Sequence, residues 1–152
     1  MRVSAKTDYA LRAAVELAAA GGGGPVKGEK LATSQSIPLR FLENILLQLR
    51  HAGIVESRRG ADGGYRLARP SEEITLADVI RAIDGPLAGV SGQRPETLDF
   101  KGSSEPLREV WVAVRASLRG VLEQVTLADV ASGELPGNVR DLTSEPDAWV
   151  PH

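Results

Sequence analysis

Residues 54–68 contain the feature that most restricts the fold, a change from a helical to a strand repeat around a glycine-rich turn. Before residue 54, apolar residues recur with helical spacing. Two short stretches then follow, at residues 54–58 and 65–68, whose composition is typical of strands. The six residues between them (RGADGG) are typical of a hairpin tip. Because a lone hairpin is barely stable, we predict a mainly α fold on which a two-stranded hairpin packs.

Three helices are expected before this hairpin. The first begins after Ser4, a good N-cap, and ends at the four glycines 21–24, whose backbone entropy opposes a helix. Its apolar positions are Leu11, Ala14, Val15 and Ala18. The second covers about residues 28–33, and the third opens at Pro38 and ends at Gly53. The third places Leu42, Ile45, Leu46 and Leu49 on one face. This order, with a turn at residues 34–36, predicts a winged helix-turn-helix whose wing is the hairpin.

Two later helix starts share one sequence. Thr75 and Thr126 each begin the string TLADV, in which threonine and the aspartate three residues later form a capping box. The echo is too short for a structural repeat, so we interpret it as the same helix start used twice. Gly85 and Pro86 end the first of these helices.

An apolar stripe runs through a long predicted helix at residues 105–125. It comprises Leu107, Val110, Trp111, Val114, Leu118, Val121, Leu122 and Val125. One winged domain has little surface to cover it, which favours packing partly on its own domain and partly against the same helix of a second chain. The alternative is that the helix closes the core of a monomer. We therefore expect a winged domain over 1–85, a loop over 86–104, a dimerisation helix and short final helix over 105–133, and a flexible tail over 134–152.

Several chemistries are excluded by what the 152 residues lack. There is no cysteine, which removes disulfides, thiolate nucleophiles and zinc–thiolate sites. The two histidines, His51 and His152, offer no triad or metal site. The glycine-rich tip lacks the Lys-Ser/Thr ending of a phosphate loop. We predict no enzyme, no catalytic residues, no metal and no cofactor. No apolar run approaches a membrane span and the N-terminus lacks a signal-peptide core, so a cytoplasmic protein is expected.

The charge is unevenly distributed. The net charge is −2, but residues 1–85 carry 12 basic and 10 acidic side chains, and residues 86–152 carry 6 and 10. Residues 40–69 contain six arginines against three acids. Local clustering of this kind is what a nucleic-acid site needs, although a solvated arginine-rich surface would have the same sequence.

The third helix and the wing contain the side chains suited to reading DNA. In the major groove, arginine can bind guanine, glutamate can accept from cytosine and asparagine can pair with adenine. An arginine-bearing hairpin tip suits the minor groove. The predicted DNA-binding residues are Arg40, Glu43, Asn44, Arg58, Arg59, Gly60 and Tyr65. Tyr65 is expected to pack on the domain with its hydroxyl near a phosphate. Glu43 is explained equally well as a helix-surface acid. For the hairpin tip the alternative is a solvated turn, and the minor groove is the favoured interpretation.

Three runs resemble the bacterial Rrf-two family of transcriptional regulators, at residues 37–46 (IPLRFLENIL), 49–55 (LRHAGIV) and 59–68 (RGADGGYRLA). The N-terminal segment 1–11 and the segment 73–80 match as well, and residues 107–130 match more loosely. The resemblance covers about residues 1–131. It implies a homodimeric winged-helix repressor on a near-palindromic operator in double-stranded DNA, associated with the nucleoid. The family's recognition positions fall on Arg40, Glu43 and Asn44, its minor-groove arginine on Arg59, and its dimerisation helix on the long helix.

The chain departs from the family in one specific way. Cluster-binding members place three cysteines in the loop before the long helix, and this loop has none. Asp8 resembles the non-cysteine ligand of some members, but without thiolates it is better interpreted as a surface or capping acid. The chain therefore resembles a cysteine-free branch that does not sense through an iron–sulfur cluster. A small molecule between the winged domain and the long helix, a partner protein, or no effector at all remain open. The alternative function is a winged-helix module that binds protein without specific DNA binding.

Overall fold

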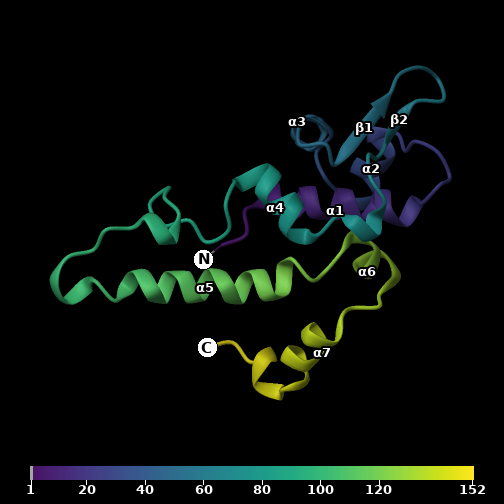
Figure 1. Cartoon of the computed structure of the whole chain (residues 1–152). Coiled ribbons are helices and arrows are strands. Elements are labelled where there is room, and N and C mark those ends of the chain that lie inside the picture. Colours follow the sequence, from purple (N-terminus) through teal and green to yellow (C-terminus); the bar gives the residue numbers. More distant parts are fainter. Residues whose placement is uncertain (1) are drawn as a thin grey trace.

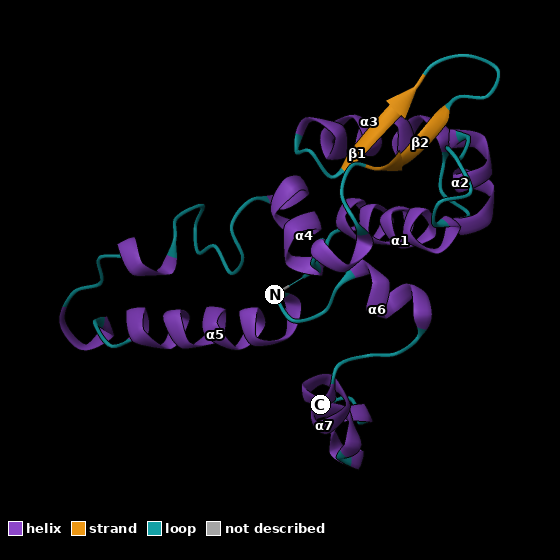
Figure 2. Cartoon of the chain, turned by 45° about the vertical axis from the view of Figure 1, so that its right-hand side comes forward, coloured by secondary structure: helices purple, strands orange, loops and turns teal. Residues whose placement is uncertain are grey.

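The computed structural model describes residues 2–152, so Met1, the first residue of the predicted winged domain, lies outside the described residues. The chain is mainly helical with a two-stranded antiparallel sheet (Figures 1 and 2). Its regular elements are α1 (Ala5–Ala20), α2 (Gly28–Gln35), α3 (Leu39–His51), β1 (Val55–Arg58), β2 (Gly64–Leu67), α4 (Leu76–Asp84), α5 (Leu107–Leu122), α6 (Leu127–Ser132) and α7 (Gly137–Ser144). Three helices followed by a hairpin confirm the predicted winged-helix fold.

Helix α1 lies at the centre of the winged domain, in contact with α2, α3, α4, α6 and β2. Ser4 caps it as predicted, since its Oγ accepts a hydrogen bond from the Thr7 backbone N–H at 3.1 Å. The buried face of α1 is formed by Thr7, Ala10, Ala13, Ala14 and Leu17. This face is rotated about the helix axis relative to the predicted one, because the predicted Leu11, Val15 and Ala18 are only half-buried. Small alanines at the centre let the surrounding helices approach closely.

Helices α2 and α3 form the helix-turn-helix. Helix α2 extends two residues beyond the predicted residue 33 and ends at Ser36, whose φ of 53° is left-handed. Helix α3 begins at Leu39, one residue later than predicted, because Pro38 takes the N-cap position and not the first helical position. The predicted core residues of α3 are all buried, namely Leu42, Ile45, Leu46 and Leu49. The opposite face of α3 is thereby turned outward.

The wing is an antiparallel hairpin in which Val55 pairs with Leu67 and Arg58 with Gly64. It is fixed to the domain by a contact that the sequence pattern does not predict. The backbone N–H of Val26 donates to the Tyr65 carbonyl, and the N–H of Tyr65 donates to the Val26 carbonyl, both at 2.8 Å. The segment before α2 thus acts as a one-residue third strand at the edge of the wing.

Both predicted capping boxes are present. Thr75 accepts from the Asp78 backbone N–H and Thr126 from that of Asp129, and each aspartate accepts in return. The two helix starts also lie side by side, because the Leu76 N–H donates to Val125 and the Leu127 N–H to Ile74. This antiparallel contact places α6 on α1 and buries Leu127 in the core of the winged domain.

Helix α5 extends away from the winged domain, on the side opposite the wing (Figures 1 and 2). None of its residues is buried. The preceding loop is better packed than its Gly-, Ser- and Pro-rich sequence predicts, since Leu87, Pro95 and Leu98 are buried and two 3₁₀ turns, Pro95–Thr97 and Gly102–Ser104, interrupt it.

The tail also contains regular structure that its sequence pattern does not predict. Helix α7 precedes a 3₁₀ turn, Pro146–Trp149, and the Trp149 indole N–H donates to the Thr143 carbonyl at 2.7 Å. Asn138 joins α7 to the end of α5 by donating to the Gly120 carbonyl at 2.8 Å. Every residue from Arg140 onward is exposed.

Candidate DNA-binding surface

The outward face of α3 presents Arg40, Glu43 and Asn44, all of them exposed. Within residues 2–152, the side chains of Arg40 and Glu43 form no hydrogen bond or ion pair. Asn44 accepts a hydrogen bond from the Gln48 amide at 3.0 Å, which leaves its own NH₂ group outward as a donor. These three side chains lie in the first half of α3, the part of a recognition helix that approaches base edges.

The wing presents a second set of cations. Arg58 ends β1 and Arg59 follows it in the turn, and both are exposed. Their side chains, too, make no hydrogen bond or ion pair in the described part of the chain. Lys27 anchors the tip from the side, because its ammonium donates to the Gly60 carbonyl at 3.1 Å. The exposed glycine tip leaves the turn narrow, which suits a groove.

The remaining arginines of the 40–69 segment are engaged within the protein. Arg66 pairs with Glu56, its partner in the strand register. Arg50 donates to the Ser57 hydroxyl at 2.9 Å, and Arg69 donates to the Glu73 carbonyl at 3.3 Å. Within residues 40–69, the arginines without an internal partner are therefore Arg40, Arg58 and Arg59, which are the three that the sequence analysis assigned to DNA.

Aromatic contacts fix the angle of α3 on α1. The rings of Phe41 and Tyr9 meet edge to face with centroids 5.7 Å apart, and the Arg12 guanidinium lies 4.7 Å above the Tyr9 ring. Tyr65 is half-buried against the core and close to Gly28. These contacts hold the recognition helix and the wing as one surface.

Two residues of this surface lie outside the predicted set. Lys27 supports the wing from a segment that sequence patterning assigns only to a helix start. Leu47 lies one turn beyond Glu43 and is 42% exposed, an unusual position for a leucine. Its i+4 spacing from Glu43, which is readable in the sequence, places it on the same outward face of α3.

The apolar stripe of α5 is only partly covered by its own chain. Leu107 is 42% and Val110 is 50% exposed, and the other stripe residues within α5 are only half-buried, namely Trp111, Val114, Leu118, Val121 and Leu122. Monomeric proteins rarely expose a continuous apolar surface of this length. Among the described residues, no helix is long and apolar enough to cross a membrane.

The fold and this surface are those of the winged-helix class of DNA-binding proteins. Comparison with known proteins gives the family. A family model described as Rrf2, an iron-dependent transcriptional regulator, matches residues 3–133. The chain belongs to the Rrf2 family, as the sequence resemblance indicated. Members of this family are named as transcriptional regulators and not as enzymes, so the predicted absence of enzymatic activity is confirmed.

Individual relatives agree with this assignment. The chain is 52% identical over 145 residues to Rv1287 of Mycobacterium tuberculosis, named as a candidate HTH-type regulator, with 95% of this chain and 90% of that protein covered. It is 38% identical over 132 residues to the regulator CymR of Bacillus subtilis, covering 87% and 91%. The solved structure of that CymR matches with a TM-score of 0.75 at 35% identity, over 88% of this chain and 98% of the other. The structure of T. potens IscR matches with a TM-score of 0.70 at 34% identity, over 100% and 93%.

The family's description as iron-dependent makes the donor set of this chain important. Thiolates, the usual ligands of iron–sulfur clusters, are absent from the sequence. Within residues 2–152, no group of three or more histidine, aspartate or glutamate side chains is placed to hold a metal. Asp8 instead pairs with Arg12 at 2.9 Å. The residues present do not fit a thiolate-ligated iron centre.

Proposed function

We propose that this chain is a homodimeric, sequence-specific repressor that binds a near-palindromic operator and does not sense through an iron–sulfur cluster. The observation that carries the proposal is the pairing pattern of the arginines. Arg40, Arg58 and Arg59 have no internal partner among the described residues and lie on α3 and the wing, where a duplex would meet them. Cations held in solvent without partners are available to phosphates and base edges.

Sequence specificity is supported by Glu43. A carboxylate close to phosphates is repulsive, so a protein that bound DNA only through its charge would gain by losing it. Glu43 has no cationic partner among residues 2–152 that would give it a structural role. We assign it to cytosine N4, with Arg40 on guanine and Asn44 on adenine. Arg58 and Arg59 bind in the minor groove or to its phosphates, and Tyr65 supports the wing and approaches a phosphate through its hydroxyl.

The homodimer is supported by the apolar stripe of α5, which its own chain covers only in part. Two copies of α5 packed against each other would bury the stripe of both chains in an isologous interface. The two recognition helices would then address two half-sites, for which the operator symmetry must match the protein symmetry. The repressor role is proposed from the resemblance to the family alone. A dimer bound across a promoter in the cytoplasm would act by blocking the polymerase.

A mobility-shift titration with the DNA upstream of its own gene tests the DNA-binding surface. Arg59→Ala is expected to weaken specific binding at least about tenfold, because each protomer then lacks a charge-assisted hydrogen bond to the duplex. The slope of the log–log salt plot should also fall by about 0.9 for each phosphate that is no longer bound. Arg140→Ala, an exposed arginine on α7, is the control with the same change of charge. Equal DNA binding by the two variants would show that the wing is not part of the DNA-binding surface.

The same purified protein tests the proposal about the cluster. The dimer purified without oxygen is expected to be colourless, to contain no iron and to bind the operator in the presence of a chelator. A brown protein with visible absorption, or DNA binding that is abolished by chelation, would contradict this part of the proposal.

The repressor role is tested with a reporter gene placed behind the operator. Expression of the reporter is expected to rise when the gene for this protein is deleted, and a fall would indicate an activator.

A further inference from the structure

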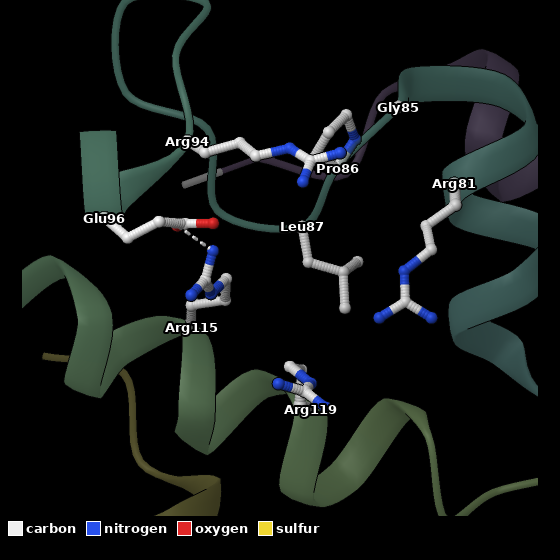
Figure 3. Close-up of a pocket in the computed structure, with 8 residues that line it drawn as sticks. All are labelled: Arg81, Gly85, Pro86, Leu87, Arg94, Glu96, Arg115 and Arg119. Carbon is white, nitrogen blue, oxygen red and sulfur yellow. Dashed lines mark hydrogen bonds and ion pairs between the residues drawn. The ribbon is translucent and has the colours of Figure 1, made fainter. Parts of the chain in front are cut away.

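A hollow lined by four arginines lies between the winged domain and α5. Arg81 reaches it from α4, Arg94 from the loop, and Arg115 and Arg119 from α5, one turn apart (Figure 3). Their guanidinium groups surround the side chain of Leu87. We call this hollow of about 460 Å³ the arginine pocket. Its volume is that of a site for a small metabolite.

The arginine pocket has more positive charge than its own acids balance. Arg115 pairs with Glu96, and Arg81 and Arg119 share the single carboxylate of Glu123. The Arg94 side chain has no hydrogen bond or ion pair within residues 2–152. Four cations therefore face two carboxylates, and most of the N–H donors of these arginines are uncommitted.

The two carboxylates remain charged at neutral pH, so the surplus is fixed. The pKa of Glu96 is lowered by a hydrogen bond from its own backbone N–H and by Arg115. Hydrogen bonds from Arg81 and then Arg119 lower the pKa of Glu123. The surplus is notable because residues 86–152, which supply three of the four arginines, carry an excess of acids.

We propose that the arginine pocket binds a small organic anion with two or more acidic groups, carboxylate or phosphate, and that this ligand regulates DNA binding. Arg94 and Arg119 lie on opposite sides of Leu87, so separate acidic groups can pair with each while the carbon skeleton contacts the leucine. Planar guanidinium groups bind both kinds of acid in the bidentate mode.

The regulatory part of this inference rests on the proposed function. Arg81 belongs to α4, which packs on α1, whereas Arg115 and Arg119 belong to the proposed dimerisation helix. An anion bound by both elements fixes α4 relative to α5 and therefore sets the separation of the two recognition helices in the dimer. A change in this separation alters how well both half-sites are engaged.

Isothermal titration of the full-length protein without DNA tests the binding site. The probes are citrate, succinate and inorganic phosphate in a buffer free of other multivalent anions, with succinamide as the neutral match and sodium chloride at equal ionic strength. Citrate or succinate is expected to bind and succinamide is not. Phosphate binding as tight as that of citrate would assign the site to the phosphate group alone and overturn the role given to Leu87.

Arg94→Gln is the decisive variant, because it removes a cation from the pocket without breaking an ion pair. It should weaken anion binding at least about tenfold, whereas Arg140→Gln should not change it. Thermal melting of both variants checks the fold. Equal affinity in the two variants, or no binding of any probe to the wild type, would overturn the site.

The operator titration is then repeated with and without saturating citrate. An operator affinity that shifts with citrate in the wild type and not in Arg94→Gln supports regulation. If citrate binds but the operator affinity does not change, the regulatory role is overturned and only the anion-binding site stands. Failure of the proposed function is separately visible, because the protein would then not bind the operator even without citrate.

Discussion

Two adjacent glycines in the wing show how strongly single residues determine this surface. A Cβ on Gly63 would lie 2.1 Å from the Arg58 carbonyl oxygen, and a Cβ on Gly64 would lie 2.5 Å from that of Val26. Both distances are far inside van der Waals contact. Gly64 also has a φ of 146°, which side chains of L-residues rarely adopt. The glycine pair is what lets the hairpin close and lie against Val26.

Gly64→Ala is therefore expected to destabilise the protein by about 1–3 kcal/mol from backbone strain alone, with a further decrease if the pairing with Val26 breaks. Urea unfolding followed by circular dichroism measures the change. Gly22→Ala is the matched control, because its Cβ would meet nothing within 4 Å and its φ is not positive. That variant should stay within about 0.5 kcal/mol of the wild type or gain slightly. Equal stability of the two variants would refute the steric argument.

At the scale of elements, the two TLADV segments do more than start helices. Each threonine satisfies a backbone N–H of its own helix, and the two caps are joined by hydrogen bonds between their backbones. The chain that leaves α5 thereby returns to the winged domain and inserts Leu127 into the core. The repeated sequence is explained by two local cap geometries that meet in space.

Removal of either cap hydroxyl, in Thr75→Ala or Thr126→Ala, is expected to lower the free energy of unfolding by about 1 kcal/mol, within a range of roughly 0.5–2. Thr143→Ala removes a hydroxyl that donates to the Val139 carbonyl within α7 and caps nothing. Chemical denaturation of all three variants provides the comparison. Decreases in the cap variants no larger than that of Thr143→Ala would show that the capping boxes contribute little.

What could be predicted from the sequence was local. Ser4, the capping boxes, the core face of α3 and the hairpin all follow from spacing and turn chemistry within a few residues. The pairing of Val26 with Tyr65, the contact between the two caps and the arginine pocket join residues that are distant in the chain, and no local period marks them. The packed loop escaped prediction because a few apolar anchors among many small residues sufficed to fix it. Helix α7 escaped because a short exposed helix needs no apolar stripe.

For the residues proposed to bind DNA, the sequence supplied the candidates and the structure supplies which of them have a partner within the chain. Arg66 and Arg59 look alike as arginines of the wing, but only Arg66 has a partner, Glu56, across the strand register. The number of charged residues in the segment could not distinguish them, because it does not say which acidic side chain lies next to which arginine. The same limitation hid the arginine pocket, because three of its four arginines lie in residues 86–152, whose net charge is negative.

At the scale of the whole molecule, α3 and the wing lie on one side of the winged domain and α5, which carries the apolar stripe, extends from the other (Figure 1). The wing and α3 face away from α5, so contact between two α5 helices would leave both recognition surfaces free. Because Leu107 and Val110 of the stripe are exposed in the single chain, they can be changed without opening the core. The proposed dimer can therefore be tested separately from folding.

Val110→Glu tests this arrangement, because Val110 is 50% exposed in the single chain and belongs to the stripe. A carboxylate facing apolar side chains in each protomer should raise the dimer dissociation constant at least about a hundredfold. Sedimentation should then report the 16.1 kDa monomer with unchanged helical content. Val150→Glu changes a valine that is 54% exposed in the tail and should remain a dimer. At equal protein concentration, Val110→Glu should bind a single half-site as the wild type does but without the added affinity for the full operator. A monomeric wild type, or a dimeric Val110→Glu protein, would show that the stripe of α5 has another role.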